Sequence, residues 1–275
     1  MNRTRWLLIA CGVPVLLVVL VLLAGALAPK SDQPPAPTTT TATPPPSNFT
    51  PGTADRVNVG RGVQGAAIFR PSDGSDPDAP VVVFLHGWAA IDAAFYGPWI
   101  DHLVRRGTTV VYPTYQEPPF LDTATPLPNV LIALRLAFAE LQVKPERLVV
   151  AGHSAGGALA ADYAASARAA GMPEPASVFS VYPGRAIGDV PAQLKPVDAK
   201  NIAPGTRVLV YGGARDRLVG TRSAREIART ATRANTTLRV IREAGVADHA
   251  APARATPDSR RVFWEPLDQL VDATG

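Results

Sequence analysis

Cysteine is nearly absent from this sequence, since Cys11 is the only one in 275 residues. No disulfide can therefore form within the chain, and no metal site can be built from cysteines. Charged residues make up only 18%, and the formal net charge is +4. Residues 1–54 hold three basic residues and one acid, which leaves +2 for the remainder. A nearly neutral remainder shows no electrostatic pattern for binding nucleic acid.

One long run without charge lies near the N-terminus, at residues 6–28, and it is 23 residues long. About 18 apolar residues are enough to span a bilayer, and basic residues at positions 3 and 5 favour a cytoplasmic start. We expect residues 1–28 to be a transmembrane anchor, or an uncleaved signal, with the rest of the chain outside the cytoplasm. Two alternatives stay open: cleavage after residue 28, which would make the protein secreted, and lipidation at Cys11.

A linker is expected at residues 29–54, where eight prolines and a threonine tract cannot form a packed core. From residue 55 to the end, apolar β-branched runs alternate with helical patterns, which predicts βαβ units and a parallel sheet with helices on both faces. The expected strands are 65–70, 81–85, 108–112, 148–151, 177–182, 206–211 and 236–241. The expected helices are 95–106, 129–142, 155–170, 221–234 and 259–271.

The sequence Gly152-His153-Ser154-Ala155-Gly156 lies between an apolar run and a helical pattern, which is the setting of a nucleophile elbow. A serine at so tight a turn adopts a strained backbone angle, and its hydroxyl emerges above the carboxyl edge of the sheet. Backbone lies too close to the positions two residues before and after it to leave room for a Cβ, which explains both glycines. Ser154 is therefore the candidate nucleophile.

A serine hydroxyl needs an adjacent base near neutral pH, and that base is most often histidine. Three of the four histidines are poorly placed: His86 ends a strand, His102 lies within a helix, and His153 points away from the adjacent serine. His249 follows the last strand, on the rim where the serine emerges. His249 is the candidate base.

The histidine needs an acid that orients it and stabilises its charged form. Asp216 follows the strand at 206–211, and the chain order serine, aspartate, histidine is that of α/β-hydrolases. Asp189 and Asp198 are the alternatives, whereas Asp248 is poorly placed to reach the ring of its neighbour His249. Asp216 is therefore the candidate acid.

A tetrahedral intermediate needs two N–H donors directed at its oxygen. The backbone amide of Ala155, directly after the nucleophile, is the first candidate. The second candidate is the backbone amide of Trp88, because Gly87 lets the loop after the strand at 81–85 approach closely. The ring of Trp88 either lines an acyl pocket or packs in the core.

Residues 85–88 and 152–157, with Asp216 and His249, closely resemble the α/β-hydrolase superfamily, and the resemblance extends from about residue 60 to the end. The two stretches are similar to its serine esterase and lipase branches. The resemblance implies a three-layer α/β fold with a mostly parallel, eight-stranded sheet, acyl-enzyme chemistry, and no cofactor or metal. A short segment at 183–205 indicates a minimal lid and an open site.

The expected function is ester hydrolysis by a membrane-tethered, extracytoplasmic serine hydrolase whose catalytic domain is residues 55–275. Its substrate would be a small-molecule or lipid ester, and the sequence identifies neither the acyl chain nor the alcohol. An acyltransferase with the same triad and a non-catalytic binding domain on this fold remain alternatives. Arginines at 222, 225, 229 and 233 share one helical face. That stripe is either simply solvated or contacts anionic lipid or cell-envelope polymer.

Overall fold

The structure is a computed structural model, and it describes residues 50–52, 54–72, 76, 78–186 and 193–274. The expected anchor at residues 1–28 and most of the expected linker at 29–54 lie outside the described residues. No helix within the described part combines the length and the hydropathy needed to cross a membrane.

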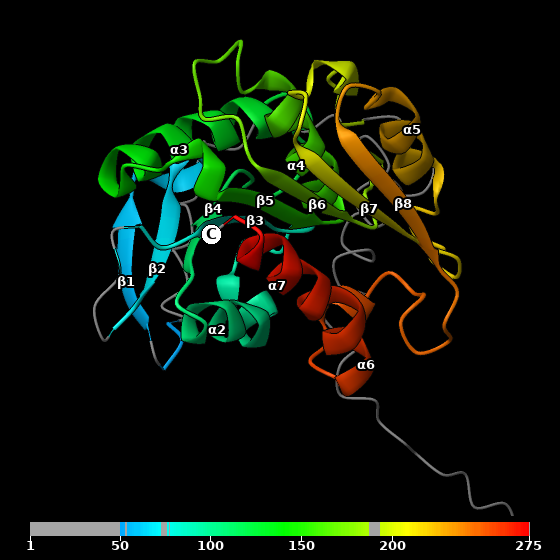
Figure 1. Cartoon of the computed structure of the whole chain (residues 1–275), viewed down its shortest axis with the longest axis horizontal. Coiled ribbons are helices and arrows are strands. Elements are labelled where there is room, and N and C mark those ends of the chain that lie inside the picture. The colour runs from blue at the N-terminus through cyan, green and yellow to red at the C-terminus, as the bar shows by residue number, and fades with distance from the viewer. Residues whose placement is uncertain (1–49, 53, 73–75, 77, 187–192, 275) are drawn as a thin grey trace, which may run out of the picture. The chain divides into compact units, whose positions relative to one another are not determined.

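An eight-stranded sheet forms the centre of the fold, in the spatial order β1-β2-β4-β3-β5-β6-β7-β8 (Figure 1). The strands are β1 (Ala54–Val59), β2 (Ala66–Pro71), β3 (Val81–Leu85), β4 (Thr109–Pro113), β5 (Leu148–His153), β6 (Ser177–Val181), β7 (Arg207–Gly213) and β8 (Asn235–Ile241). β2 pairs antiparallel with both β1 and β4, and the remaining neighbours pair parallel. The predicted mostly parallel sheet of eight strands is confirmed.

The central strands are apolar along their length because both of their faces are covered. Every residue of β3, β4, β5 and β6 is buried, whereas β8, the last strand of the order, alternates between exposed and half-buried positions. The carboxyl ends of the parallel strands meet at one edge of the sheet. That edge is where open α/β sheets bind their ligands.

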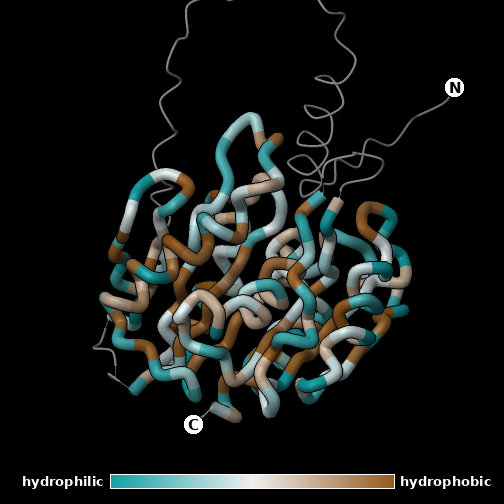
Figure 2. The backbone as a smooth tube through the Cα atoms, turned by 90° about the horizontal axis from the view of Figure 1, so that it is seen from above, coloured by the Kyte–Doolittle hydropathy of each residue, from teal (hydrophilic) through white to brown (hydrophobic). Residues whose placement is uncertain are grey.

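Helices cover both faces of the sheet, as Figure 1 shows. One face carries α3 (Pro126–Leu141), α4 (Ala155–Ser166) and α5 (Arg222–Thr230), and the other carries α2 (Gly97–Arg105) and α7 (Glu265–Asp272). Each face has its own hydrophobic cluster, and Figure 2 shows that hydrophobic residues concentrate inside and hydrophilic residues lie towards the periphery. The fold is therefore the predicted three-layer arrangement.

The short helices are η1 (Gly62–Gln64), η2 (Ala93–Tyr96), η3 (Pro145–Arg147), η4 (Ala199–Asn201), η5 (Ala251–Ala253), α6 (Pro257–Ser259) and the π-helical η6 (Arg260–Trp264). The single helix expected at 259–271 is therefore wrong, because α6, η6 and α7 divide that segment. Pro266 has no N–H to donate to residue 262, and the ladder shifts so that Glu265 N–H donates to the carbonyl of Arg260.

Two other expectations differ from the structure. The helix expected at 129–142 begins earlier, at Pro126, because a proline fits the first helical turn, where the missing N–H has no intrahelical partner. β1 was not expected as a strand, and it starts at Ala54, inside the expected linker. Its burial pattern is that of a half-exposed edge strand, with a mixed sequence that gives no clear alternation.

Candidate active site

The turn between β5 and α4 holds Ser154 at φ 58° and ψ −122°, a strained conformation for a residue with a side chain. A Cβ on Gly152 would lie 2.2 Å from the carbonyl oxygen of Gly156, and one on Gly156 would lie 2.0 Å from that of Leu85. The predicted reason for both glycines is confirmed. The serine is thereby held at the carboxyl end of a central strand.

Three side chains that are far apart in the sequence meet at this turn. His249 Nε2 lies 2.9 Å from Ser154 Oγ, and His249 Nδ1 lies 2.7 Å from Asp216 Oδ2. Because a carboxylate can only accept, Nδ1 donates its proton to Asp216, and Nε2 is left to accept the serine hydroxyl proton. The side chain of Asp216 is fully buried, and that of His249 is 14% exposed. The geometry allows a proton to move from Ser154 to His249.

The loop after β7 orients the Asp216 carboxylate with two further hydrogen bonds. Its Oδ1 accepts from the backbone amides of Leu218 at 2.9 Å and Val219 at 3.0 Å. Asp248 instead pairs with Arg254 and accepts from the amide of Ala250. The structure therefore brings Asp216, and not the sequence neighbour of His249, to the imidazole.

The two alternative acids are not brought to the histidine. Asp198 is exposed and accepts from the amide of Lys200 at the start of η4. Asp189 lies outside the described residues.

The loop that follows β3 lies beside the serine. A Cβ on Gly87 would be 3.5 Å from Ser154 Cβ, and the backbone amide of Gly87 donates to the hydroxyl of Tyr96 at 3.1 Å. The backbone amides of Trp88 and Ala155 donate to no group within the described residues. These two N–H groups are therefore free of protein acceptors there, and the oxyanion role that the sequence predicts for them stays a prediction.

The ring of Trp88 is half-buried and packs against the hydrophobic cluster on the α3 and α4 face. Its Nε1 donates to the carbonyl of Phe120 at 3.1 Å. Tyr115 lies in the loop after β4, as Phe120 does, and is buried in that cluster. Packing in the core accounts for both rings.

A pair of buried side chains, Tyr96 and His153, connects the three loops of the site and was missed in the sequence. His153 Nε2 lies 2.9 Å from the carbonyl oxygen of His249, so Nε2 carries the proton. His153 Nδ1 then accepts the Tyr96 hydroxyl proton at 2.8 Å, and the Tyr96 oxygen accepts from Gly87. The tautomer of His153 that is protonated at Nε2 thus satisfies all three hydrogen bonds, which link the loop after β3 to the loop that carries His249.

The environment keeps His153 neutral. Burial is the main cause that lowers its pKa well below the usual 6.5, and the proximity of His249 lowers it further. The two rings lie 4.8 Å apart between centroids. A neutral His153 avoids placing a second positive charge beside His249 when that ring accepts a proton.

Replacing Tyr96 by phenylalanine should lower kcat about tenfold or more and leave KM nearly unchanged. The ring stays in place, but the amide of Gly87 loses its acceptor and His153 loses a donor, at roughly 1–3 kcal/mol for such buried groups. Steady-state kinetics with a chromogenic ester measures both constants. Tyr163→Phe is the matched control, because Tyr163 lies on α4 and its hydroxyl donates to the backbone carbonyl of Pro173, away from the site. An equal loss in both variants would contradict the positioning role.

His86, which directly precedes Gly87 at the end of β3, is fully buried and stacks on Tyr115 with 4.0 Å between ring centroids. Its Nδ1 bonds the carbonyl of Gly87, and its Nε2 has no partner within the described residues. Burial lowers the pKa of His86 to about 4. The ring is therefore a neutral packing element at neutral pH.

Acid should destabilise the fold through this histidine. The unfolded chain binds a proton at His86 near pH 6.5, and the folded chain only near pH 4. The contribution is therefore complete above about pH 6.5 and is lost as the pH falls towards 4, by roughly 3 kcal/mol in total. Denaturant unfolding at several pH values measures the slope. His86→Gln should reduce this slope, while buried His153 continues to contribute to it, and an unchanged slope would refute the assignment.

The loop after β6 is held to α4 by a buried ion pair. Arg185 makes two hydrogen bonds to Asp162, at 2.7 Å and 2.8 Å, and the amide of Val197 donates to the same carboxylate. The described part of segment 183–205 contains one short helix, η4. The presence of a single short helix in residues 183–186 and 193–205 agrees with the expected minimal lid.

Comparison with known proteins places this fold. The sequence matches a family described as having the alpha/beta hydrolase fold over residues 82–211. A search of curated proteins gave no matching sequence.

Solved structures give the same result. An esterase/lipase from an uncultured bacterium aligns with a TM-score of 0.65 at 16% identity, over 94% of this chain and 98% of its own. An esterase of the bacterial hormone-sensitive lipase family aligns with 0.58 at 17% identity, over 94% and 97%. Esterase B from Lactobacillus rhamnosis aligns with 0.60 at 16% identity, over 82% and 88%. At these identities the similarity to solved structures concerns the fold alone, and together with the family match over residues 82–211 it shows that the chain has the alpha/beta hydrolase fold.

Proposed function

We propose that this protein is a serine hydrolase that cleaves carboxylic esters through an acyl-enzyme. The observation that carries the proposal is the pair of hydrogen bonds linking Ser154 Oγ to His249 at 2.9 Å and His249 to Asp216 at 2.7 Å. The esterase and lipase names of the similar structures support the same reaction class.

In the first half of the reaction, Ser154 Oγ attacks the ester carbonyl carbon while His249 Nε2 takes the hydroxyl proton. The carbonyl oxygen becomes an oxyanion, which the backbone amides of Trp88 and Ala155 stabilise, each contributing about 10²–10³-fold in rate. Asp216 stabilises the imidazolium that forms. His249 then gives its proton to the leaving alcohol, and the acyl group stays on Ser154.

In the second half, His249 removes a proton from water, which attacks the acyl carbon. The bond from that carbon to Ser154 Oγ then breaks, His249 returns its proton to Oγ, and the carboxylic acid is released. An alcohol in the same position would accept the acyl group instead, and the protein would then act as an acyltransferase. Water and alcohol use the same base and the same oxyanion donors. The two activities therefore differ in the acceptor and not in the triad.

The test combines labelling with product analysis. The full chain, in a neutral detergent, should react with a fluorophosphonate probe at Ser154 and release p-nitrophenol from short acyl esters. A panel of esters that differ in acyl length identifies the preferred chain. Adding an alcohol acceptor separates the two activities, since a transferase yields a new ester in place of free acid. If the chain shows no labelling and no turnover, the result favours a non-catalytic domain and overturns the proposal.

We further propose that residues 6–28 anchor the hydrolase in the membrane, with residues 55–275 on the extracytoplasmic side. The support is the uncharged run of 23 residues behind a basic start. Cell fractionation with an antibody against the C-terminal part tests it. The full-length chain should stay in the membrane fraction after a salt wash. A shortened chain in the culture medium would show cleavage and contradict the anchor.

A further inference from the structure

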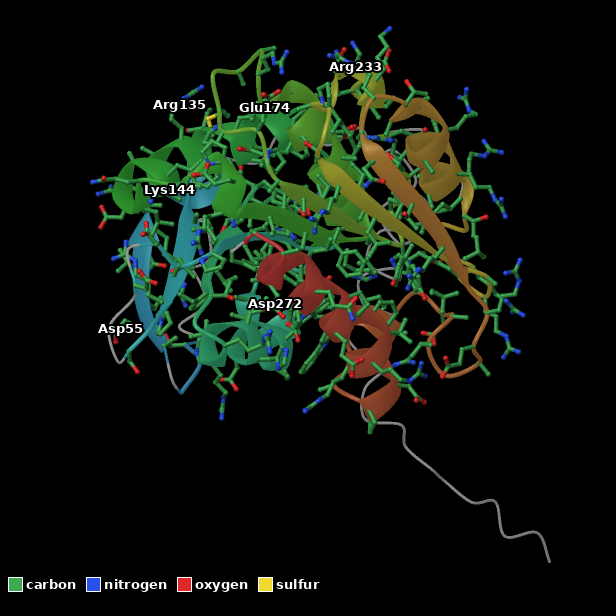
Figure 3. The ribbon with its side chains drawn as sticks, viewed as in Figure 1. Asp55, Arg135, Lys144, Glu174, Arg233 and Asp272 are labelled. Carbon is green, nitrogen blue, oxygen red and sulfur yellow. The ribbon has the colours of Figure 1, made fainter. Side chains whose placement is uncertain are left out.

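Nine exposed arginines lie at the end of the molecule that β7, α5, β8 and their connecting loops form, a region that we call the arginine face. They are Arg207, Arg215, Arg217, Arg222, Arg225, Arg229, Arg233, Arg239 and Arg242. Figure 3 labels Arg233 among the nitrogen-tipped side chains that project from this end of the molecule. A third of the 27 basic residues of the chain therefore lie in 36 consecutive positions.

Few acids offset this charge. Residues 207–242 contain only Asp216, which is buried against His249, and Glu226, which is exposed on α5. Their formal charge is +7, from nine arginines and two acids, whereas the whole chain carries +4. The rest of the sequence is therefore at −3. The low overall charge hides a strongly basic region.

The arginines of this face lack carboxylate partners within the described residues. Elsewhere arginines pair with acids, as Arg168 does with Glu174 and Arg106 with Asp272. On the arginine face, Arg239 instead donates to the hydroxyl of Tyr211 and Arg225 to that of Thr221. No carboxylate of the described part of the chain thus forms an ion pair with these arginines.

The face curves around the edge of the sheet. Arg222, Arg225 and Arg229 form one row about 10 Å long on α5, whose opposite side buries residues 224 and 227 against one hydrophobic cluster. Arg239 lies over the ring of Tyr211, which belongs to the cluster on the other face of the sheet. A flat surface reaches only one of these two sides, whereas a flexible chain can follow both.

We propose that the arginine face binds a linear acidic polysaccharide, whose repeated carboxylate or sulfate groups match the row of guanidinium groups. Guanidinium binds such oxyanions through paired hydrogen bonds. Single-stranded nucleic acid fits less well, because Tyr211 is the only aromatic residue in 207–242 and it is buried, so bases have nothing to stack on. A bilayer fits less well because the face is curved. This binding does not depend on the proposed ester hydrolysis.

The test measures binding of fluorescent heparin, used as a linear acidic polysaccharide, to the full chain in neutral detergent at low salt. The triple variant R222Q/R225Q/R229Q should bind about tenfold more weakly, because three ion pairs with the polysaccharide are lost. The matched control R61Q/R135Q/R168Q removes the same charge from other elements, where all three arginines are exposed. It should bind within about twofold of the unchanged protein. Ester turnover should stay the same in both variants.

Two competing ligands give the other outcomes. Single-stranded DNA and vesicles with anionic phosphatidylglycerol are measured against the same variants. If the triple variant loses more binding to DNA or to vesicles than to heparin, the assignment of a polysaccharide as the ligand is overturned. An equal loss in the matched control would reduce the effect to net charge and overturn the site. No heparin binding by the unchanged protein would overturn it as well.

Discussion

Replacing Ser154 by alanine should lower kcat for ester hydrolysis about 10⁶-fold, and replacing Asp216 by asparagine should lower it about 10⁴-fold. The first change removes the atom that forms the acyl-enzyme. The second keeps the shape of the side chain but presents an amide to His249 Nδ1, which lies 2.7 Å from the carboxylate oxygen. An amide nitrogen there favours the tautomer in which Nε2 is protonated and cannot accept the serine proton.

Both rates are measured with a short p-nitrophenyl ester, and labelling by a fluorophosphonate probe gives an independent readout. Asp248→Asn is the matched control, because Asp248 adjoins His249 in sequence but pairs with Arg254. Its kcat should stay within a few-fold of the unchanged protein. If Asp248→Asn were the more damaging change, the acid of the triad would be assigned wrongly. Turnover by Ser154→Ala at the original rate would remove the serine mechanism altogether.

The sequence predicted the sheet and the elbow because both depend on local patterns. Strands buried on both faces are continuous apolar runs, as at Val81–Leu85, and the short length and β-branched residues of that run favour a strand over a helix. The choice of Asp216 and His249 followed from a topological rule, since the ends of parallel strands share one edge of the sheet. Chain order and strand ends were therefore enough to bring these residues together.

The roles of Tyr96 and His153 could not be predicted in the same way. Tyr96 ends η2, a short helix with no distinctive pattern, and its hydroxyl meets His153 from 57 positions away. Such a contact depends on how α2 packs against the sheet, which hydropathy does not specify. The sequence did show that His153 points away from the serine. It did not show that the ring would instead hold the carbonyl of His249.

The arginine face was visible only in part. The helical spacing of residues 222, 225, 229 and 233 gave one stripe, for which a solvated surface was the simpler interpretation. The fold adds Arg239 and Arg242, because β8 lies beside β7 at the edge of the sheet. Parallel pairing of these strands thus joins arginines from separate elements into one region. A one-dimensional charge average could not reveal it.

Adding one methyl group to the elbow should destabilise the protein strongly. In Gly156→Ala the new Cβ would lie 2.0 Å from the carbonyl oxygen of Leu85 and 2.5 Å from that of His86. Both atoms are backbone at the end of a central strand, so they cannot rotate away as a side chain would. The free energy of unfolding should fall by about 4 kcal/mol or more, which is a large part of the stability of a typical domain.

Denaturant unfolding compares this variant with Gly245→Ala, whose new Cβ would meet only a side-chain oxygen of Asp258 at 3.5 Å, an ordinary contact. That control should change stability by less than about 1 kcal/mol. A stable, active Gly156→Ala protein would mean that α4 and β3 do not approach as closely as this elbow requires. Because the same approach brings the loop that begins with His86 beside Ser154, such a result would also remove the geometric basis for an oxyanion donor at Trp88.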